Sequence, residues 1–561
     1  TAGLSAQSRM FSGRDILLNG NPVRLRIATL HGSMPEKAAE AYIQHYKTLG
    51  YNCAEIVIRD TANCGVFRDL LNTADRLGFL LVISIPGAEQ YYGKWEQHGN
   101  REEWIASTKA LIRQFRNYPS FIIWATNRNS LGYPLDQHPE CIGTDYYPPS
   151  GSTPDLRWNS TAKEIVRLLG EMDSTRPVFS HAGGNYGAIH SSNVYLNMLP
   201  VAEKAQWPSV WKTRGTKPFL AIELGMPCDL TWYACRESVL SSRNYRSEPL
   251  FNEYAAMILG PEAFSLDKIH LPNILQNEKV VVKGWGGIDS YPDMGKYHYG
   301  VLVNRSALTQ IKMGEKLSHF LPYWRAFGVS GFGPWLSESV VLNGVRHQSP
   351  EKPVYRNWKT PGYKQQFTYG VFYDGPTSFG KTFSRMMSPE LFLLTGPDDD
   401  PTDETVSFLP GAEVRKSYCW INDSFQTRQR TVEILLEDAG GKVLWKRKNI
   451  LSAASGETVR KPAVFILPKV SGRTSYRLIL KADGEEKGCL ALNAVPVPEI
   501  NSDTVTLMDP DIIFQFRFFL TKSAFSRPSA QIGREQILHK RIFFLREKSF
   551  LLWFRPRRTN S

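Results

Sequence analysis

Short apolar runs alternate with amphipathic stretches from about residue 16 to residue 335. The runs are rich in Val, Ile, Leu and Phe, which is typical of buried strands, and the stretches between them have helical spacing. Strands that alternate with helices are expected to pair in parallel. Eight strands are predicted, over residues Val23–Thr29, Cys53–Ile58, Leu80–Ile85, Phe121–Thr126, Val178–His181, Asn193–Leu196, Phe219–Ile222 and Val329–Gly333.

Helices are predicted between these strands, and glycines mark the ends of two of them. Gly50 and Gly78 stand where a left-handed helix cap is expected. Eight strands over about 320 residues fit a closed (β/α)8 TIM barrel of the α/β class. An open doubly wound sheet is the competitor, but no G-x-G-x-x-G segment follows the first strand. The helical segments include Lys37–Leu49, Phe67–Leu77, Glu102–Arg116 and Ala162–Met172.

After about residue 389 the pattern changes to short alternating runs separated by turn residues. Such spacing predicts an antiparallel, immunoglobulin-like β-sandwich. We therefore divide the chain into a barrel over 11–388, a sandwich over 389–511 and a tail over 512–561. The expected sandwich strands are Ser407–Leu409, Ser417–Ile421, Thr431–Leu436, Val443–Arg447, Ala463–Ile466 and Tyr476–Leu480.

The tail carries most of the net charge. The chain has a formal charge of +13, and residues 512–561 contribute +9 of it, which leaves +4 for the other 511 residues. Ten of the fifty tail residues are Phe or Trp. One interpretation is a basic aromatic arm for an anionic polymer or a membrane. The interpretation that we prefer is a disordered or non-native segment, such as read-through after a frameshift.

The composition of the whole chain is that of a soluble globular protein, with 42% hydrophobic and 22% charged residues. No apolar run approaches the ~20 residues that span a membrane. The seven cysteines are scattered without a C-x-x-C pair, and we find no cluster of metal ligands. We therefore expect no metal and no cofactor. The chain does not begin with Met, and we expect a fragment or a processed chain.

One strand delivers a carboxylate to its carboxyl end. The stretch Lys217-Pro-Phe-Leu-Ala-Ile-Glu-Leu-Gly225 carries an apolar run and then Glu223. An unpaired charge is costly at the end of a buried strand, so packing does not explain this residue. In (β/α)8 barrels the carboxyl ends of the strands hold the catalytic residues. The sequence thus indicates that Glu223 is catalytic; the structural alternative is a charge where the strand meets solvent.

Further blocks carry a resemblance to a known family. Leu18-Asn-Gly-Asn-Pro-Val-Arg-Leu-Arg26 precedes strand one, Arg116-Asn-Tyr-Pro-Ser-Phe-Ile-Ile-Trp124 leads strand four, and Lys217–Gly225 forms strand seven. Asp75-Arg-Leu-Gly78 and a last strand that closes on Trp335 add to them. Together, over about residues 11–500, these blocks resemble the catalytic barrel of glycoside hydrolase family 2, the β-galactosidase and β-glucuronidase group. The family's amino-terminal sandwich pair has no counterpart here.

The resemblance implies retaining hydrolysis of glycosides by two carboxyl groups about 5–5.5 Å apart. Glu223 occupies the family's nucleophile position. His31, at the end of the first strand, matches a position that contacts a sugar hydroxyl. For Trp124 the alternative to sugar stacking is a place in the core. The other residues expected to bind substrate are Asn127, Arg128, His181, His190 and Trp335.

Two positions depart from the family's pattern. Strand four continues as Trp124-Ala-Thr-Asn-Arg-Asn129, so Asn129 stands where the acid/base glutamate belongs and Arg128 where the preceding Asn does. An amide has no proton to donate near neutral pH, so the two-carboxylate mechanism is not intact. In strand two, Glu55 stands where the family has an active-site Arg.

The identity of the proton donor stays open. A relocated acid/base can be Glu55, or Asp145 in the loop after strand four, or one of the histidines His181 and His190. Glu55 can equally be chance drift in an inactive barrel. A lone histidine is more often a hydrogen-bonded structural residue or a sugar contact than a proton donor.

Our hypothesis is an atypical glycosidase that hydrolyses O-glycosidic bonds of a glycan, with Glu223 as nucleophile and Asn129 orienting the substrate. We expect a carbohydrate partner, no nucleic acid and no membrane, an undefined oligomeric state, and a bacterial periplasmic or secreted location. The alternative is a catalytically inactive family 2-like barrel that binds carbohydrate. A third and weaker option is a partner role for the basic tail.

Overall fold

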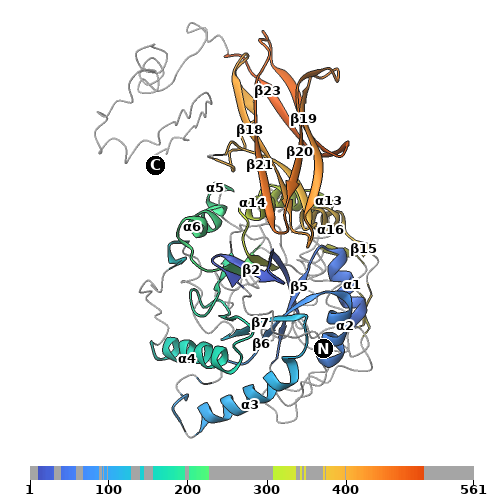
Figure 1. Cartoon of the computed structure of the whole chain (residues 1–561). Coiled ribbons are helices and arrows are strands. Elements are labelled where there is room, and N and C mark those ends of the chain that lie inside the picture. The colour runs from blue at the N-terminus through green and yellow to red at the C-terminus, as the bar shows by residue number, and fades with distance from the viewer. Residues whose placement is uncertain are drawn as a thin grey trace, which may run out of the picture. The chain divides into compact units, whose positions relative to one another are not determined.

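The computed structural model describes the strands of a barrel and of a sandwich (Figure 1). The chain falls into two compact units, one made of residues up to 393 with 419–429 and 451–460, the other of 394–418, 430–450 and the residues from 461 on. The expected tail at 512–561 lies outside the described residues. Those described are 11–30, 39–58, 67–87, 91, 94–97, 99–127, 139–143, 156–195, 201–225, 307–335, 341–343, 346–348, 370–372, 375–398 and 400–497.

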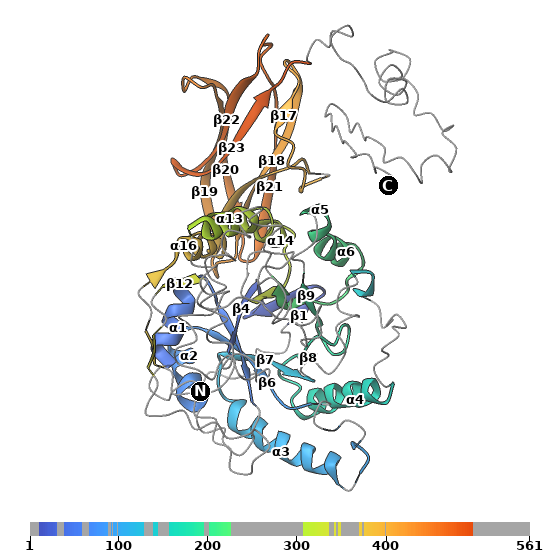
Figure 2. The ribbon, with the colours of Figure 1, turned by 180° about the vertical axis from the view of Figure 1, so that it is seen from behind.

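Eight parallel strands form one continuous sheet in the first unit, in the order β8-β7-β6-β5-β4-β11-β10-β9. All eight strands expected from the sequence are present, and one of them, β7, has the predicted bounds. Figure 2 shows several of them from behind. Their bounds are β4 Leu25–Leu30, β5 Cys53–Val57, β6 Leu80–Ser84, β7 Phe121–Thr126, β8 Val178–Ser180, β9 His190–Tyr195, β10 Phe219–Gly225 and β11 Gly331–Trp335.

The ends of this sheet, β8 and β9, are joined through the short segment between them. Phe179 is bridged to Gly187, and Gly184 to Ser191. Gly184 and Ser191 exchange backbone hydrogen bonds of 2.8 and 2.9 Å. The sheet is thereby nearly closed, and the fold is a (β/α)8 TIM barrel followed by a β-sandwich, as the sequence predicts. The open doubly wound sheet is excluded by this strand order.

Helices lie outside the strands of the first unit (Figures 1 and 2). The four predicted helices are present, and α2 matches its predicted bounds residue for residue. No helix of the described ranges combines the length and the apolar content needed to cross a membrane. The helices are α1 Ala39–Thr48, α2 Phe67–Leu77, α3 Asn100–Phe115, α4 Leu156–Met172, α5 Val201–Lys204, α6 Gln206–Arg214, α13 Ala307–Ser318, α14 Leu321–Ala326 and α16 Ser378–Met386, with a 3-10 turn η5 at Pro139–Cys141.

Glycine ends the first of these helices, as predicted. Gly50 has φ +89°, and its N–H donates to the carbonyl of Lys47 at 3.0 Å. The next N–H, of Tyr51, donates to Tyr46 at 3.0 Å. This pair of bonds is the Schellman motif, which satisfies the last carbonyls of a helix. Gly78 ends α2 in the same left-handed region, with φ +62°.

A small antiparallel sheet precedes the barrel. It consists of β1 Phe11–Ser12, β2 Asp15–Leu18 and β3 Asn21–Val23. Leu18 pairs with Asn21 across a two-residue loop, and both loop residues have positive φ, 54° at Asn19 and 80° at Gly20. Asn-Gly in this geometry is the preferred loop of a tight hairpin.

Apolar residues fill two layers on either side of the barrel wall. The outer layer, between strands and helices, includes Phe219 and Ala221, and the inner layer includes Leu220 and Ile222. This alternation follows from the two-residue period of a strand. Four of the other inner residues are Cys53 of β5, Val82 of β6, Ala125 of β7 and Phe179 of β8.

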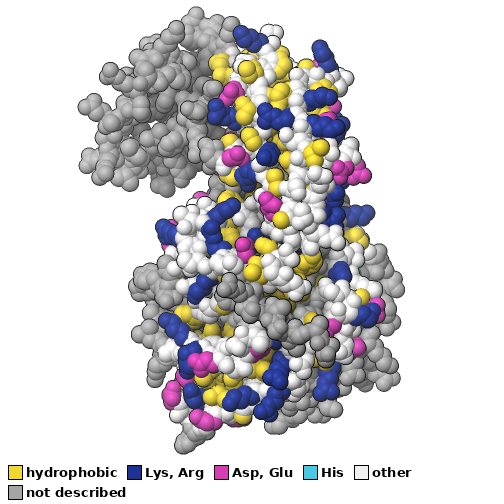
Figure 3. Space-filling view, in the orientation of Figure 1, with side chains coloured by type: hydrophobic (Ala, Val, Ile, Leu, Met, Phe, Trp, Pro, Cys, Tyr) yellow, Lys and Arg dark blue, Asp and Glu magenta, His cyan; other side chains and the backbone are white. Residues whose placement is uncertain are grey.

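The sandwich consists of a three-stranded sheet, β16-β18-β21, and a five-stranded sheet, β17-β23-β22-β19-β20. The six predicted strands are present, whereas β16 and β23 were not predicted. On the face shown in Figure 3, Lys and Arg side chains are spread among apolar ones. The bounds are β16 Glu390–Thr395, β17 Ser407–Phe408, β18 Glu413–Asn422, β19 Arg428–Glu437, β20 Val443–Ala453, β21 Glu457–Ile466, β22 Thr474–Ala482 and β23 Glu485–Ala494.

Short strand pairs complete the described chain after the barrel. β12 pairs with β15, and β13 pairs with β14, both antiparallel. Their bounds are β12 Leu342–Asn343, β13 Arg346–Gln348, β14 Gly370–Phe372 and β15 Gly375–Pro376.

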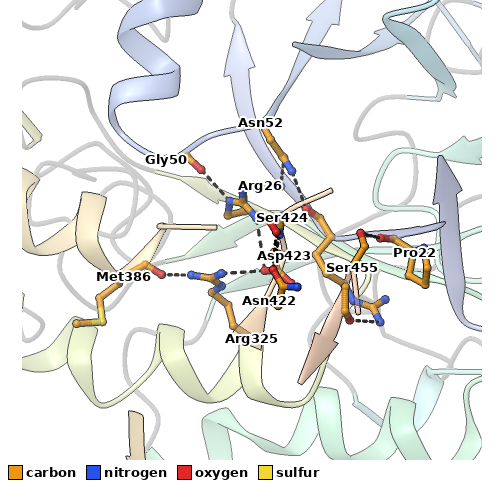
Figure 4. Close-up of polar contacts among 12 residues, drawn as sticks. Pro22, Arg26, Gly50, Asn52, Arg325, Met386, Asn422, Asp423, Ser424 and Ser455 are labelled. Carbon is orange, nitrogen blue, oxygen red and sulfur yellow. Dashed lines mark hydrogen bonds and ion pairs between the residues drawn. The ribbon is translucent and has the colours of Figure 1, made fainter. Parts of the chain in front are cut away.

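A buried ion cluster lies in the first unit (Figure 4). Oδ2 of Asp423 lies 2.8 Å from Arg325 of α14 and 3.4 Å from Arg26 of β4. Arg26 also donates to the carbonyl of Gly50 at 2.7 Å. Burial is the largest cause that lowers the pKa of Arg26, to about 10, the neighbouring Arg325 adds to the shift, and Asp423 opposes it. The single carboxylate therefore stabilises two buried cations.

Candidate active site

Polar side chains begin where the apolar filling of the barrel ends. Glu55 follows the inner residue Cys53 by two positions on β5, and His181 follows the inner residue Phe179 by two positions after β8. A spacing of two keeps a side chain on the same face of a strand. Glu55 and His181 are therefore expected to point into the barrel above its apolar layer, and both are fully buried.

Glu223 reaches the same interior through an irregularity in β10. Ala221 pairs with Ser192 of β9, but Glu223 pairs with the very next residue, Asn193, so β10 carries one extra residue. The pairing of β10 with β11 shifts over the same stretch. Since Ile222 already points inward, a regular strand would turn Glu223 outward; an extra residue of this kind re-aims the side chain. Glu223 thus faces inward directly after Ile222.

The His181 ring lies between the two carboxylates. Its Nδ1 is 3.1 Å from Oε1 of Glu55, and its Nε2 is 3.2 Å from Oε1 of Glu223. The main chain fixes the ring's position as well, because the His181 N–H donates to the carbonyl of Thr126 at 2.7 Å. The side chains of Glu55 and His181 are 0% exposed and that of Glu223 is 3% exposed.

The two carboxylates favour the charged form of the ring. Burial, the largest single cause, lowers the pKa of His181, but Glu55 and Glu223 together outweigh it and raise the pKa to about 9. His181 is therefore an imidazolium at neutral pH. A buried carboxylate beside a buried cation stays ionised, and an ionised carboxylate is the form that acts as a nucleophile.

Trp124 lies in the core. Its side chain is 0% exposed, its Nε1 donates to Asp173 at 2.8 Å, and its ring meets Phe121 edge-on with centroids 4.5 Å apart. No face of the indole is open to a sugar. Of the two interpretations that the sequence leaves for this residue, the geometry favours the core, and we correct the expectation of a stacking contact.

Asn127 follows β7 in a left-handed conformation, with φ 57°. Its Nδ2 donates to the carbonyl of Ala162 on α4 at 3.1 Å, and the residue is fully buried. This contact joins the end of β7 to a surrounding helix. Its expected role in substrate binding stays a prediction.

His190 lies at the wrong end of its strand for the expected role. It is the first residue of β9 and pairs with Phe219, the first residue of β10, whereas Glu223 pairs with Asn193. Burial, and secondarily the charge of Lys217, lowers the pKa of His190 to about 3. His190 is thus neutral near pH 7, and a neutral imidazole does not act as a general acid. We correct its assignment as a proton donor, because the strand begins earlier than its apolar residues indicate.

The remaining expected site residues are not described at the side-chain level. His31, Arg128, Asn129 and Asp145 lie outside the described residues. Trp335 ends β11 and pairs with Gly225 of β10, so its backbone is at the carboxyl end of the barrel. Their roles stay predictions.

Sequence reasoning missed two polar residues near this site. Asn193 of β9 pairs with Glu223 and is fully buried. Ser84 follows the inner residue Val82 by two positions on β6, and its hydroxyl has no hydrogen-bond partner within the described ranges. A polar residue two positions after the last apolar inner residue is the signal that would have found Ser84.

The arrangement does not favour a metal ion. The described part of the chain holds no group of three or more potential ligands placed to bind one. Glu55 and Glu223 engage opposite nitrogens of one imidazole, so their nearest oxygens face the ring and not a common point. The site instead offers two carboxylates that share one imidazole ring between them.

Comparisons with known proteins find similarity at the level of solved structures. No protein-family model and no curated protein matches the chain. The chain is similar to a β-D-mannosidase from Dictyoglomus thermophilum, with 13% identity and a TM-score of 0.46 over 85% of this chain and 51% of that one. It is also similar to an exo-chitosanase from Amycolatopsis orientalis, with 13% identity and a TM-score of 0.43 over 90% of this chain and 52% of that one.

A third similar structure is a β-glucuronidase from Bacteroides uniformis, with 14% identity and a TM-score of 0.36 over 87% of this chain and 48% of that one. The chain spans about half the length of each of these three solved structures. At these values the fold rests on the strand order of the chain itself, and its activity has to be argued from the Glu55–His181–Glu223 geometry.

Proposed function

We propose that the chain is the catalytic part of a retaining glycoside hydrolase in which Glu223 is the nucleophile. The observation that carries the proposal is the buried contact of Glu223 with His181 inside the barrel, which is 3.2 Å long. A carboxylate placed by a strand irregularity beside a cation is costly to build for packing alone. It suits a group that has to be ionised and fixed before it attacks.

In this reaction the Glu223 carboxylate attacks the anomeric carbon, and the bond from that carbon to the leaving-group oxygen breaks. The leaving oxygen takes a proton from an acid on the opposite side of the sugar. Water then attacks the glycosyl ester, gives its proton to the same group, and releases the sugar and Glu223. The two displacements leave the anomeric configuration unchanged.

The proton donor has to stand apart from the nucleophile. Glu55 and His181 do not meet this requirement, because Glu55 faces the ring and the ring contacts Glu223 itself. His190, at the other end of its strand, is neutral near pH 7. Among the candidates named from the sequence, Asp145 remains, and we propose it as the donor, with Asn129 orienting the substrate.

The test is a screen of the full chain against aryl glycosides and polysaccharides, with Glu223→Gln in parallel. Aryl glycosides with good leaving groups need little help from an acid, so they report on the nucleophile alone. We expect cleavage with retained configuration, and a loss of at least about 1,000-fold in kcat/KM for the variant. Undiminished cleavage by Glu223→Gln would overturn the assignment.

The inactive-barrel alternative gives a different result in the same screen. It predicts glycan binding by calorimetry with no cleavage of any aryl glycoside. Asp145→Asn separates the donor from the nucleophile: it should slow glycosides with poor leaving groups strongly and activated aryl glycosides little. Equal slowing of both kinds of substrate would remove Asp145 as the donor.

A further inference from the structure

Glu55 faces a histidine that lies between it and Glu223. Its Oε1 lies 3.1 Å from Nδ1 of His181, and its side chain is 0% exposed. Glu223 contacts the opposite nitrogen of the same ring. Glu55 therefore contacts the far side of the His181 ring as seen from Glu223. This placement suits a residue that acts on Glu223 through His181.

We propose that Glu55 and His181 are positioning residues for Glu223: Glu55 holds the ring as an imidazolium, and the imidazolium orients the Glu223 carboxylate and keeps it ionised. The inference rests on the proposed function, since it takes Glu223 as the nucleophile. It gives neither residue a contact with the substrate, and it replaces the expectation that Glu55 is a relocated proton donor.

Hydrogen-bond geometry supports a charged ring. A neutral imidazole has one N–H donor and one acceptor nitrogen, whereas the imidazolium donates from both nitrogens. Each nitrogen of His181 faces a carboxylate oxygen at 3.1 or 3.2 Å. With a neutral ring and two carboxylates, one of these contacts would place a lone pair against an anion. Only the cation makes both contacts favourable while both carboxylates stay ionised.

The balance of buried charge leads to the same assignment. Glu55 of β5, His181 just after β8 and Glu223 of β10 lie together without exposure to solvent beyond the 3% of Glu223. Two carboxylates buried side by side without a cation would force one of them to take up a proton. With the imidazolium between them, the group carries a net charge of −1. What little exposure the group has is at Glu223, and the Glu55 side chain has none.

Few other charged groups act on the ring. Within the described part of the chain, the charged side chains that shift the pKa of His181 are Glu55 of β5 and Glu223 of β10. From β7 it meets the neutral carbonyl of Thr126, and on the side of β9 the Ser191 hydroxyl binds the next backbone N–H, of Ala182. Cys53, below Glu55 on β5, is held as a thiol because burial raises its pKa.

A dependence of activity on pH follows. The ring is charged up to about pH 9, because its carboxylate partners outweigh the effect of burial. Below that pH the orientation of Glu223 is maintained; above it the cation is lost and Glu223 loses its partner. The loss of activity above this pH should appear in kcat for an activated aryl glycoside. KM should change little, because neither Glu55 nor His181 contacts the substrate in this proposal.

The direct test is an NMR titration of the full chain with isotope-labelled histidine rings. The His181 signal is identified as the one missing in His181→Asn. We expect its midpoint near pH 9 in the unmodified chain and at least about one pH unit lower in Glu55→Gln. A His181 midpoint close to the ordinary value of about 6.5, or one that Glu55→Gln does not move, would overturn the proposal.

Kinetics supply a second readout. Glu55→Gln should lower kcat for an activated aryl glycoside by about 10- to 100-fold, as expected when a reacting group loses its orientation. It should also move the alkaline limb of the profile of kcat against pH to lower pH. Glu55→Asp keeps the charge and should recover part of the rate. If Glu55→Gln instead loses rate only with poor leaving groups, Glu55 is a proton donor and the positioning role is wrong.

A matched control separates positioning from general loss of stability. Asp173→Asn also removes a buried carboxylate, one that pairs with Arg176 at 3.5 Å and accepts a bond from Trp124. It should destabilise the barrel but leave the alkaline limb in place. If Asp173→Asn shifts the alkaline limb of the profile of kcat against pH as far as Glu55→Gln does, the loss of stability alone explains the effect of Glu55→Gln.

The two proposals fail in different ways. If the unmodified chain cleaves no glycoside, the proposed function fails, while the titration still decides whether Glu55 holds His181 charged. If the chain cleaves aryl glycosides and the His181 ring is neutral at pH 7, the proposed function stands and the positioning role is overturned.

Discussion

Asp423 accepts a hydrogen bond of 2.8 Å from Arg325 in the interior of the first unit, where the two side chains are 4% and 1% exposed. Asp423 also lies 3.4 Å from Arg26. It is the anion that these two guanidinium groups share. Removing it leaves two buried cations at short range with no carboxylate between them.

We expect Asp423→Asn to lower the free energy of unfolding of this unit by about 3–5 kcal/mol, the usual cost of breaking a buried ion pair from one side. Chemical denaturation followed by the fluorescence of the buried tryptophans measures the loss. The matched control is Glu40→Gln, which removes an exposed pair with Arg76 and should cost far less, because solvent screens exposed ion pairs. Equal costs for the two variants would contradict the buried role of Asp423.

The glycines that end α1 and α2 should tolerate alanine differently. Both have positive φ, but a Cβ on Gly50 would lie 2.5 Å from Cβ of Met387, whereas a Cβ on Gly78 meets nothing within 4 Å. Gly78→Ala should cost about 1 kcal/mol from backbone strain alone. Gly50→Ala should cost at least about 1–3 kcal/mol more, because packed backbone has to move. Thermal unfolding of the two variants side by side gives the difference.

Trp124→Phe tests the core assignment. The substitution leaves the Asp173 carboxylate without its 2.8 Å indole donor, and we expect a loss of stability of about 1–3 kcal/mol. Since the Trp124 side chain is 0% exposed, KM for a glycoside substrate should not change. A rise in KM with stability unchanged would restore the interpretation of Trp124 as a sugar-stacking residue.

His190 should make the barrel sensitive to acid. Its pKa is lowered to about 3 in the folded chain, against about 6.5 when unfolded, so the unfolded state binds a proton more readily. Its contribution to stability is complete above pH 6.5 and is lost as the pH falls toward 3, by up to about 1.4 kcal/mol per pH unit. His190→Gln should flatten this part of the stability profile. If urea denaturation gives the same dependence of the unfolding free energy on pH between pH 6 and pH 4 for the variant and the unmodified chain, a neutral His190 is contradicted.

His181 should make stability depend on pH in the opposite direction. Its pKa is raised to about 9 in the folded chain, so its contribution to stability is complete below pH 6.5 and is lost as the pH rises toward 9. We expect His181→Gln to be less stable than the unmodified chain at pH 6 and closer to it at pH 9. The same denaturation series, extended to alkaline pH, measures this convergence, and a constant gap would contradict the charged ring.

The sequence predicts most of the barrel well because most of its strands are compact apolar runs that alternate with helical stretches. Phe121–Thr126 reads F-I-I-W-A-T and is a strand with those bounds. An apolar run does not show which face of the strand a residue occupies. Because the strand is buried on both sides, an apolar residue such as Trp124 fits the sequence pattern whether it points to the helices or to the interior of the barrel. Its side-chain contacts, here with Asp173 and Phe121, show that Trp124 belongs to the layer between strands and helices.

Polar strands are harder to delimit. β9 reads H-S-S-N-V-Y, and only its last residues are typical of a strand. The sequence therefore predicts a strand that begins at Asn193, whereas β9 begins at His190. In the sandwich, β23 opens with E-E-K-G and lacks an alternating pattern, and it was missed. In both cases hydrogen bonding to neighbouring strands outweighs the weak local preference.

The site was predictable only in part. Glu223 is conspicuous because a charge follows an apolar run, and Glu55 because it departs from a family pattern. Their common contact with His181 joins residues 126 and 42 positions apart. That contact depends on the order of strands around the barrel, which residue patterns do not specify, and on an extra residue in β10 that no turn signal marks.

The extra residue in β10 changes the spacing at which an inward carboxylate can occur. Ala221 and Leu224 belong to the outer layer, and both residues between them, Ile222 and Glu223, face inward. A strand without Ile222 would pair regularly with β9 and would still carry its glutamate on the inner face, but directly after the residue that matches Ala221. Homologous barrels therefore have to be aligned here by their pairing with the neighbouring strand, since the same inward carboxylate can follow that residue by one position or by two.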